Sequence, residues 1–188
     1  TVNFEFFTLA IYLDFYIIAY LGLYFIFKKH LKKGEDILSI SISGNLSGSL
    51  NSSINARDIV LEKYPDRKIV CLDSLNASFG EAMSAIMASK ARDEGKTLEE
   101  TVNLISPLRL NFRSEFVVDK LTYLARGGRI SPIVASIGNL LDIKPLLRAS
   151  SEAKIESFCK VRGKKKAILK LVETVKEIKQ YISLIVMI

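Results

Sequence analysis

The chain has no tryptophan, one histidine and two cysteines among its 188 residues, and these shortages argue against several kinds of site. Cys71 and Cys159 lie far apart in apolar runs, without a CxxC pair or a Cys/His cluster, so we expect reduced thiols in a cytoplasmic protein rather than a disulfide or metal ligands. His30 lies in a basic stretch away from any serine-rich turn, where it cannot serve a Ser/His/Asp triad.

Glycine motifs that bind nucleotides are also missing. The sequence contains no GxGxxG, and the run that begins at Gly163 lacks the preceding glycine and the hydroxyl of a Walker motif. Gly127 and Gly128 follow a predicted helix and are typical of a helix C-cap. Asp73 and Asp119 each close a predicted strand as lone carboxylates, which usually cap turns. We therefore expect neither a metal site nor a bound cofactor.

The composition is that of a globular protein that leans to the apolar side. Hydrophobic residues make up 49% and charged residues 25% of the chain, enough for one substantial core or for one domain and part of another. The formal net charge of +7 favours acidic partners, whether nucleic acid, anionic lipid or an acidic protein face. The densest basic cluster contains Arg162, Lys164 and Lys165, and the only nearby aromatic residue is Phe158. This cluster is either a solvated face or a surface that docks another protein.

Residues 6–27 are almost wholly apolar and are followed by four lysines. Their length and flanking charge are typical of a transmembrane helix. Asp14 in the middle of the segment, and the ordinary globular pattern of the rest of the chain, argue against a membrane span. The segment leaves two hypotheses open, a membrane anchor or the first helix of a globular domain.

From Ile37 onward the pattern predicts alternating strands and helices. Apolar and serine residues alternate over residues 37–43, a glycine turn follows, and a helix begins near Ser47. Residues 69–72 form a short apolar run, typical of a strand buried on both faces, and a helix over residues 77–94 follows. Thr97 and Glu100 form a capping-box pattern for a short helix that we expect to end at Pro107. This part of the chain is therefore an α/β unit with a parallel sheet.

The periodicity lapses at residues 108–113, where we place a domain boundary. We expect a first α/β domain over residues 1–112 and a second over residues 113–188. The second domain begins with a strand over residues 116–118 and two short helices, the later of them opened by Ser131 and Pro132. An apolar segment over residues 143–147, a strand over residues 155–161 and a long amphipathic helix follow. A final strand over residues 182–188 has no element after it, so we expect the domain to be incomplete here.

Polar side chains gather where the first two strands end. In a parallel sheet, ligands bind beyond the carboxyl ends of the strands. One end supplies small and hydroxyl residues at a helix N-terminus, where free N–H groups favour an anion such as a carboxylate or phosphate: Ser43, Gly44, Asn45, Ser47, Gly48 and Ser49. The other end supplies Asp73, Ser74, Ser78 and Gly80. From spacing alone, the serines serve equally well as simple helix caps.

Several motifs together resemble the DegV family of bacterial fatty-acid-binding proteins. They comprise the segment from Ile42 to Ser49, Leu72-Asp73-Ser74, Gly127-Gly128-Arg129-Ile130-Ser131, Leu140-Leu141-Asp142-Ile143-Lys144-Pro145 and Lys160-Val161-Arg162-Gly163-Lys164-Lys165. They occur in the family's order between about residues 37 and 181. The resemblance implies a two-domain α/β fold in which a parallel-sheet first domain precedes a second α/β domain.

The resemblance also implies a function. Members of the family enclose one long-chain fatty acid and present its carboxylate to a separate ATP-binding kinase subunit, which makes the acyl phosphate in phospholipid synthesis. It implies a non-catalytic, cytoplasmic, lipid-binding protein with Ser47 as a carboxylate ligand, helped by Ser43, Gly48 and Ser49. Asp73, Ser74, Ser78 and Gly80 would line the pocket at the strand ends, and Arg162, Lys164 and Lys165 would dock the kinase. Membrane contact would be transient.

The chain departs from the family pattern in three places. Residues 1–31 match neither the Asp-Ser-Thr strand nor the Thr-Ser-Gln-Pro segment of the family, and a histidine-glycine-proline-glycine motif is absent from the C-terminal part. Gly44 and Ser49 stand where the family usually has serine and threonine. The alternatives to a fatty-acid carrier are a lipid-binding or scaffold domain anchored by residues 6–27, and a serine hydrolase, which the lack of a well-placed histidine disfavours.

Overall fold

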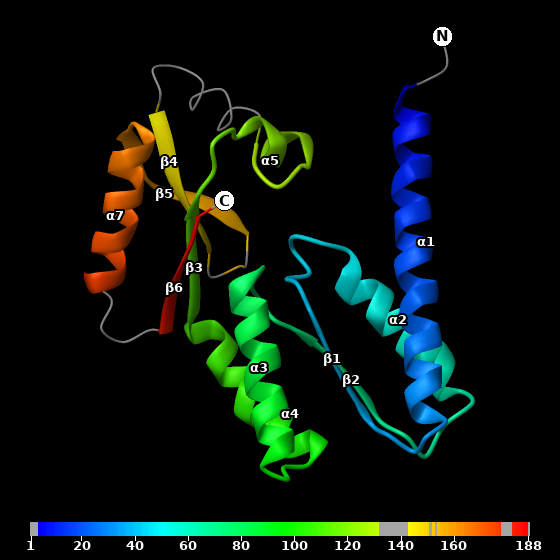
Figure 1. Ribbon diagram of the computed structural model, residues 1–188. Helices are drawn as coiled ribbons and strands as arrows, with labels where there is room; N and C mark the ends of the chain where they lie inside the picture. Colours follow the sequence, from blue (N-terminus) through cyan, green and yellow to red (C-terminus); the bar gives the residue numbers. More distant parts are fainter. Residues whose placement is uncertain (1–3, 132–142, 151, 153, 178–181, 188) are drawn as a thin grey trace.

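A computed structural model describes residues 4–131, 143–150, 152, 154–177 and 182–187. The chain forms two β-sheets with helices around them (Figure 1). The first sheet has two strands in the order β1-β2, and the second has four in the order β5-β4-β3-β6. We call the part from α1 to α4 the first lobe and the part from β3 to β6 the second lobe.

The first lobe is a parallel strand pair between two layers of helices. Strand β1 (Ile37–Ser41) pairs with β2 (Ile69–Asp73), and helix α2 (Ser49–Leu61) makes the crossover between them. Helix α1 (Phe4–Leu31) packs beside α2, while α3 (Phe79–Asp93) and α4 (Leu98–Leu108) lie on the other side of the strands (Figure 1). The predicted βαβα unit is confirmed.

The alternation of β1 decides which side chains meet which layer. Ile37 packs with Phe27, Leu31, Ala56, Val60 and Ile69 in the core under α1 and α2. Ser39 points to the same layer, where its hydroxyl bonds Ser53 of α2 at 2.9 Å. Residues 38 and 40 therefore face α3 and α4, because successive residues of a strand face opposite sides. Burial of each large apolar side chain contributes about 1.5–3 kcal/mol to this packing.

The second lobe is a mixed sheet with one long helix against one face. Its strands are β3 (Phe112–Val117), β4 (Ile143–Ala149), β5 (Ile155–Arg162) and β6 (Ile182–Met187). Its helices are α5 (Thr122–Arg126) and α7 (Lys164–Glu177), and the 3-10 turn η1 (Arg109–Asn111) leads into it from α4. Strand β4 is antiparallel to both β3 and β5, whereas β6 is parallel to β3.

The two faces of this sheet bury separate apolar clusters. On the face under α7, Val117 and Leu146 pack against Ala167 and Leu171. On the opposite face a second cluster, which we call the α5-face cluster, joins the strands to α5 and the segment after it. Its buried members are Leu121, Ile130 and Leu147, and its partly buried members are Phe116, Val118, Leu124, Ala125 and Ile155. α5 is short, with five residues.

Several predicted boundaries are confirmed and two are wrong. The capping box holds, because the Thr97 hydroxyl accepts from the N–H of Glu100 while the Glu100 carboxylate accepts from that of Thr97. The predicted end at Pro107 is wrong, since α4 continues to Leu108 and passes into η1. Pro107 lacks only its own N–H donor, and the rest of the last turn forms around it. The helix predicted to begin at Ser131 and Pro132 lies outside the described residues.

The start of β3 is the second wrong boundary. The strand begins at Phe112, four residues before the predicted start. The sequence pattern missed the first part of the strand because three consecutive residues there are polar: Arg113, Ser114 and Glu115. Glu115 is nevertheless buried, and neither of its carboxylate oxygens has a hydrogen-bond partner among the described residues.

Within the described part of the chain, no helix has both the length and the apolar character needed to cross a bilayer. The end of α1, where the sequence offered a membrane span as one hypothesis, packs against α2 through Phe27 and Leu31.

Candidate functional site

The polar turns that follow β1 and β2 lie next to each other, because both strands end at the same edge of a parallel sheet. We call them turn 43–49 and turn 74–78. The N–H of Ser43 donates to the carbonyl of Asn76 at 2.8 Å, and the N–H of Gly44 donates to the Asp73 carboxylate at 3.2 Å. Asp73 also accepts from the N–H of Leu75 at 2.7 Å, so its carboxylate fastens both turns.

The polar groups of turn 74–78 are hydrogen-bonded mainly to one another. The buried Ser74 hydroxyl donates to the carbonyl of Asn76 and accepts from its N–H. The Asn76 amide donates to the carbonyls of Ser74 and Arg109 at 3.2 and 3.0 Å. Leu75 and Ser78 both have positive φ angles, 56° and 54°, which side chains larger than glycine adopt at a cost. These bonds hold the turn in a strained conformation.

Gly80 belongs to the same locked turn. A Cβ atom at Gly80 would lie 2.5 Å from the Asn76 Oδ1, closer than two such atoms can approach. Glycine is therefore required for Asn76 to reach its partners.

Turn 43–49 leaves more of its polar groups toward the surface. Ser43 is fully buried and its hydroxyl accepts from the N–H of Asn45, so Ser43 shapes the turn. Ser47 and Ser49 are partly exposed, and their hydroxyls bond each other at 2.8 Å. Gly48 is the N-cap of α2 and offers no capping side chain of its own. The Ser47 hydroxyl accepts from the N–H of Ser49, the first residue of the helix, at 3.3 Å, so two hydroxyls lie beside the helix N-terminus.

The predicted site residues therefore fall into two groups. Ser47, Gly48 and Ser49 lie together at the accessible start of α2. The other predicted residues lie outside this group. Asp73 joins the two turns through its carboxylate, and Ser78 is exposed before α3. Three more are buried: Ser43, Ser74 and Gly80.

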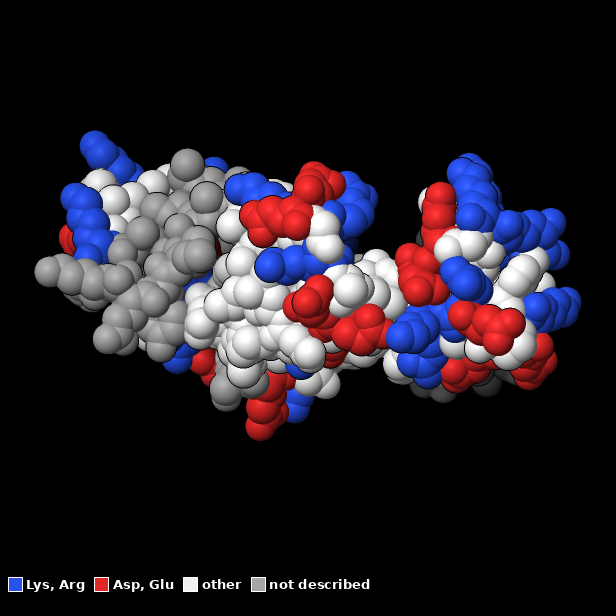
Figure 2. Space-filling view, turned by 90° about the horizontal axis from the view of Figure 1, so that it is seen from below, with Lys and Arg blue, Asp and Glu red and all other residues white. Residues whose placement is uncertain are grey.

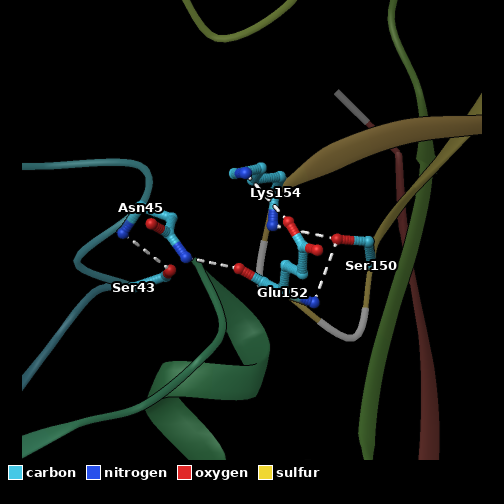
Figure 3. A network of polar contacts seen from close by, with 5 residues as sticks. All are labelled: Ser43, Asn45, Ser150, Glu152 and Lys154. Carbon is cyan, nitrogen blue, oxygen red and sulfur yellow. Dashed lines mark hydrogen bonds and ion pairs between the residues drawn. The ribbon is translucent and has the colours of Figure 1, made fainter.

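Asn45 joins turn 43–49 to the second lobe (Figure 3). Its side-chain amide donates to the carbonyl of Glu152 at 2.5 Å, in the connection between β4 and β5. The Ser150 hydroxyl accepts from the N–H groups of Glu152 and Lys154, each at 3.2 Å, and Lys154 pairs with the Glu152 carboxylate at 2.8 Å. Ser150 and Lys154 thereby hold Glu152 where Asn45 contacts it.

Arg129 makes a second contact between the lobes, and Arg109 of η1 joins β2 to the turn that leads into the second lobe. The Arg129 guanidinium donates to the carbonyl of Leu46 at 3.0 Å, and Arg109 donates to the carbonyl of Asp73. Sequence reasoning did not select Asn45, Asn76, Arg109 or Arg129 for these roles. Arg129 and Asn45 lay within the motifs that carry the family resemblance, which was the available signal.

These contacts place turn 43–49 beside the α5-face cluster. Arg129 precedes Ile130, a buried member of that cluster, and the Glu152 connection leads into Ile155, a partly buried member. The residues that contact the turn thus lie within three residues of members of the apolar cluster in the sequence. A polar group bound at Ser47 and Ser49 would have apolar surface within reach.

The ionisable groups near the site indicate no acid–base pair. Burial raises the pKa of Glu81, although its carboxylate accepts from the N–H of Ile42. Burial also raises the pKa of the Cys71 thiol, which keeps it protonated and unreactive. Among the described residues, no cluster of three or more histidine, cysteine or acidic side chains could hold a metal ion.

The predicted docking residues lie at the end of β5 and the start of α7. Arg162, Lys164 and Lys165 are all exposed. Lys164 pairs with Asp119 at 2.9 Å, and this contact lowers the pKa of that carboxyl. Part of the charge of Lys164 is therefore neutralised within the chain.

Comparison with known proteins identifies the family. The sequence profile described as "Uncharacterised protein, DegV family" matches residues 20–187. A DegV domain-containing protein of Lactococcus lactis is 43% identical over 148 residues, which are 79% of this chain and 51% of that protein. A Streptococcus pyogenes relative is 40% identical over 152 residues, 81% of this chain and 53% of its own length. The chain spans about half the length of the curated relatives that it matches.

Solved structures with the same fold include proteins crystallised as fatty-acid binders. A stearic-acid-binding protein from Eubacterium ventriosum superposes with a TM-score of 0.76 at 27% identity, over 84% of this chain and 54% of that protein. DegV from Bacillus subtilis, described as a fatty acid binding protein, gives a TM-score of 0.71 at 29% identity, over 84% of this chain and 55% of its own. The profile match, the sequence relatives and the shared fold agree, and this chain belongs to the DegV family.

Proposed function

We propose that this chain binds a long-chain fatty acid, with the carboxylate at Ser47 and Ser49 and the acyl chain along the α5-face cluster. The observation that carries the proposal is the partly exposed N-terminus of α2, where the Ser47 and Ser49 hydroxyls lie together and where turn 43–49 contacts the second lobe near that cluster. Fatty-acid binding by DegV relatives supports the same ligand class.

The carboxylate end of the ligand fits the chemistry of turn 43–49. Helix α2 has 13 residues, and its first N–H groups carry a partial positive charge that favours an anion. The Ser47 and Ser49 hydroxyls can donate to carboxylate oxygens after their mutual bond opens. Hydrogen bonds to a charged group contribute about 1.5–3 kcal/mol each.

The acyl end of the ligand fits the α5-face cluster. Several of its members, including Phe116, Val118 and Ile155, are only partly buried in the chain alone. Each methylene that moves from water onto such surface contributes about 0.8 kcal/mol. Most of the affinity then comes from the acyl chain, and the turn supplies orientation.

We test the carboxylate site with Ser47→Ala. Loss of one donor to a charged carboxylate should weaken binding by roughly 10- to 100-fold, because about 1.5–3 kcal/mol is lost. The measurements are mass spectrometry of lipid extracted from purified protein and displacement of a fluorescent fatty acid. Ser89→Ala, which changes an exposed serine of α3, is the matched control. If the two variants bound fatty acid with equal affinity, Ser47 would have only a structural role.

The second part of the proposal concerns what happens to the bound carboxylate. The chain acts as a non-catalytic, cytoplasmic carrier that presents the carboxylate to a separate ATP-binding kinase subunit, with transient contact to membranes. The lack of a nucleotide motif in the sequence supports a division of labour between two proteins. The domain division at residue 112 is part of the same proposal.

Arg162, Lys164 and Lys165 are the docking residues in this proposal. Cations at the start of α7 oppose the helix dipole, so helix stability does not explain them. Arg162→Glu should slow phosphoryl transfer with the kinase subunit at low salt and leave the fatty-acid content unchanged. Lys63→Glu, at an exposed position near the end of α2, is the control for a charge change elsewhere. Unimpaired transfer by the Arg162 variant at low salt would make the cluster an ordinary solvated face.

A further inference from the structure

Charged residues of three neighbouring strands form one row across the second lobe. Glu115 of β3 lies opposite Arg148 of β4, and Arg148 lies opposite Glu156 of β5. Directly opposed residues of antiparallel strands share a face of the sheet. Here it is the face under α7, because Val117 lies two residues beyond Glu115 and belongs to the cluster on that face. The row therefore places one guanidinium between two carboxylates, and we call it the charged row.

The two carboxylates of the charged row differ in their surroundings. Arg148 donates from Nε to Glu156 at 2.7 Å, and its guanidinium lies 5.3 Å from the centre of the Phe158 ring. The Glu156 side chain is 43% exposed. Glu115 is 4% exposed, and neither of its oxygens is hydrogen-bonded within the described chain. The guanidinium is thus bonded to the carboxylate that water can solvate, and the buried carboxylate is left without a bond.

This burial sets Glu115 apart from the other charged residues. Among the described residues, it is the one charged residue that is buried. The others are exposed or partly exposed, as on the face seen from below, where Lys and Arg side chains stand beside Asp and Glu (Figure 2). A buried carboxylate is costly unless it takes up a proton or pairs with a cation. Both routes are open to Glu115, because Arg148 lies directly opposite.

Few other ionisable groups face Glu115. Arg113 lies two residues before it on the same face of β3, and β6, on the other side of β3, has no ionisable side chain. Helix α7 covers this face, and its described charged side chains are exposed or paired with one another: Lys164, Lys165, Lys166, Lys170, Glu173 and Lys176. Burial raises the pKa of Glu115 above its ordinary value of 4.5, against the opposing effect of Arg113 and Arg148. The folded chain therefore keeps this proton to a higher pH than the unfolded chain does.

Arg148 has the donors to serve either carboxylate. In the described chain its Nε is the one donor that has an acceptor, so its terminal N–H groups are unused. When Glu115 is neutral, Glu156 is the stronger partner for the guanidinium because only Glu156 is charged. When Glu115 is ionised, it attracts Arg148 more strongly than Glu156 does, because water screens the exposed carboxylate and not the buried one.

The charged row lies at the base of the connection between β4 and β5. One further residue pair of the ladder separates the row from this connection. In the connection, the Glu152 carbonyl accepts from the Asn45 amide at 2.5 Å, which joins it to turn 43–49 (Figure 3). Among the described residues, the Arg148–Glu156 bond is the side-chain bond across β4 and β5 nearest to this contact. A change in the row therefore reaches turn 43–49 through a short, hydrogen-bonded hairpin end.

We infer that the charged row is a proton-controlled clamp on turn 43–49, with Glu115 and Arg148 as positioning residues for the bound fatty acid. With a proton on Glu115, Arg148 stays on Glu156 and steadies the connection that holds Asn45. When Glu115 loses its proton to water, Arg148 moves to it, the connection loosens, and turn 43–49 releases its ligand faster. The effect on release rests on the proposed fatty-acid site, whereas the movement of Arg148 does not.

NMR of the isotope-labelled, lipid-free chain tests the movement of Arg148. The carboxyl carbon shift follows the titration of Glu115, and the Nε–H signal follows the partner of Arg148. From about pH 4.5 to about pH 8 the Arg148 signal should change with the midpoint of Glu115, and it should stay constant in Glu115→Gln, which is neutral throughout. Glu173→Gln, which breaks an exposed pair on α7, is the control and should behave like the parent. An Arg148 signal that does not follow the titration of Glu115 would overturn the inference.

Stopped-flow release of a fluorescent fatty acid tests the link to the ligand. Release from the parent should become about two- to fivefold faster as the pH rises through the titration of Glu115. Glu115→Gln should stay slow, and Glu156→Gln, which removes the charge that holds Arg148, should be fast at every pH. The carboxyl of the fatty acid titrates in all these chains, so the difference between parent and Glu115→Gln is the signal.

Equal pH dependence of release in the parent and in Glu115→Gln would overturn the clamp. If the parent binds no fatty acid, the fatty-acid proposal fails, and the NMR titration alone decides whether Arg148 moves between the two carboxylates.

Discussion

Turn 43–49 and turn 74–78 follow neighbouring parallel strands and use similar residues, yet they behave as opposites. Turn 74–78 buries Ser74 and Asn76 and satisfies them with its own backbone and with Arg109. Turn 43–49 buries Ser43 in the same manner but leaves Ser47 and Ser49 partly exposed at the start of a helix whose N-cap is a glycine.

The difference teaches that polar composition at a strand end does not by itself identify a binding site. What distinguishes the two turns is the burial of their bonded polar groups, because Ser74 and Asn76 are buried whereas Ser47 and Ser49 are partly exposed. Turn 74–78 is a rigid support, held by Asp73 and by the contact between Gly80 and Asn76. Turn 43–49 rests on that support and carries the partly exposed hydroxyls that a ligand can reach. The following predictions test this division.

Gly80→Ala should have the largest effect, because it breaks the support. The new Cβ would displace Asn76 from its partners, and we expect a loss of about 2–4 kcal/mol in the free energy of unfolding. Urea denaturation measures it. Gly22→Ala is the control, because nothing lies within 4 Å of a Cβ at Gly22 in α1. Alanine should stabilise that helix by about 0.5–1 kcal/mol, and equal losses in both variants would contradict the role of Gly80.

Ser74→Ala and Ser47→Ala should separate the two turns directly. Loss of the buried Ser74 hydroxyl leaves the N–H of Asn76 unbonded and should cost about 1–3 kcal/mol. Ser47→Ala should change stability by less than about 1 kcal/mol, since water can reach the partly exposed position and replace the hydroxyl as the acceptor for the N–H of Ser49. Thermal unfolding of lipid-free protein compares them. If Ser47→Ala proved the more destabilising, the assignment of support and ligand site would be reversed.

Asn45→Ala should have a smaller effect that appears mainly in ligand kinetics. The bond to Glu152 helps to hold turn 43–49 against the second lobe, so its loss should cost about 0.5–1.5 kcal/mol and speed fatty-acid release by a few-fold. Asn45→Asp should release faster still, because a carboxylate would face the carbonyl of Glu152. Stopped-flow displacement of a fluorescent fatty acid measures both rates. Unchanged release in both variants would show that the contact does not restrain the turn.

Glu81→Gln should give the smallest effect, visible as a pH dependence. Burial raises the pKa of Glu81 in the folded chain above its ordinary value of 4.5, so the folded state binds this proton more tightly than the unfolded state. Stability should therefore fall as the pH rises from about 4.5 through the raised pKa. The Gln variant lacks this decline and keeps an acceptor for the N–H of Ile42. Denaturation from about pH 3 to about pH 7 should show the variant gaining relative to the parent. A constant difference would contradict the shift.

The sequence predicted the first lobe well because its signals are local. The alternation after Ile37, the apolar run from Ile69 and the Thr97 capping box each occupy a few adjacent residues, and each formed the expected element. β3 was placed late because Glu115, a charged residue in the middle of the strand, is buried against the usual pattern. A buried carboxylate without a partner breaks the rule on which the prediction rests.

The candidate site was predictable in place and not in detail. The strand-end rule located both turns, but it could not tell Ser47 from Ser74, because their difference lies in bonds to Asn76, Arg109 and Arg129. Asn45 and Glu152 are 107 residues apart, and Arg129 and Leu46 are 83 apart. Contacts at such separations depend on how the lobes pack, which no local pattern encodes.

The pairing of β3 with β6 sets the order in which the second lobe can assemble. β4 and β5 are joined by a short connection, so their hairpin can close within microseconds of both strands being available. β3 pairs with β6 in parallel from Phe112↔Ile182 onward, across some seventy residues of chain. On a ribosome, one edge of β3 must therefore stay unpaired while β4, β5 and α7 are made, and an exposed strand edge is where chains associate wrongly. The strand that covers this edge of β3, β6, is thus made only after the rest of the described sheet.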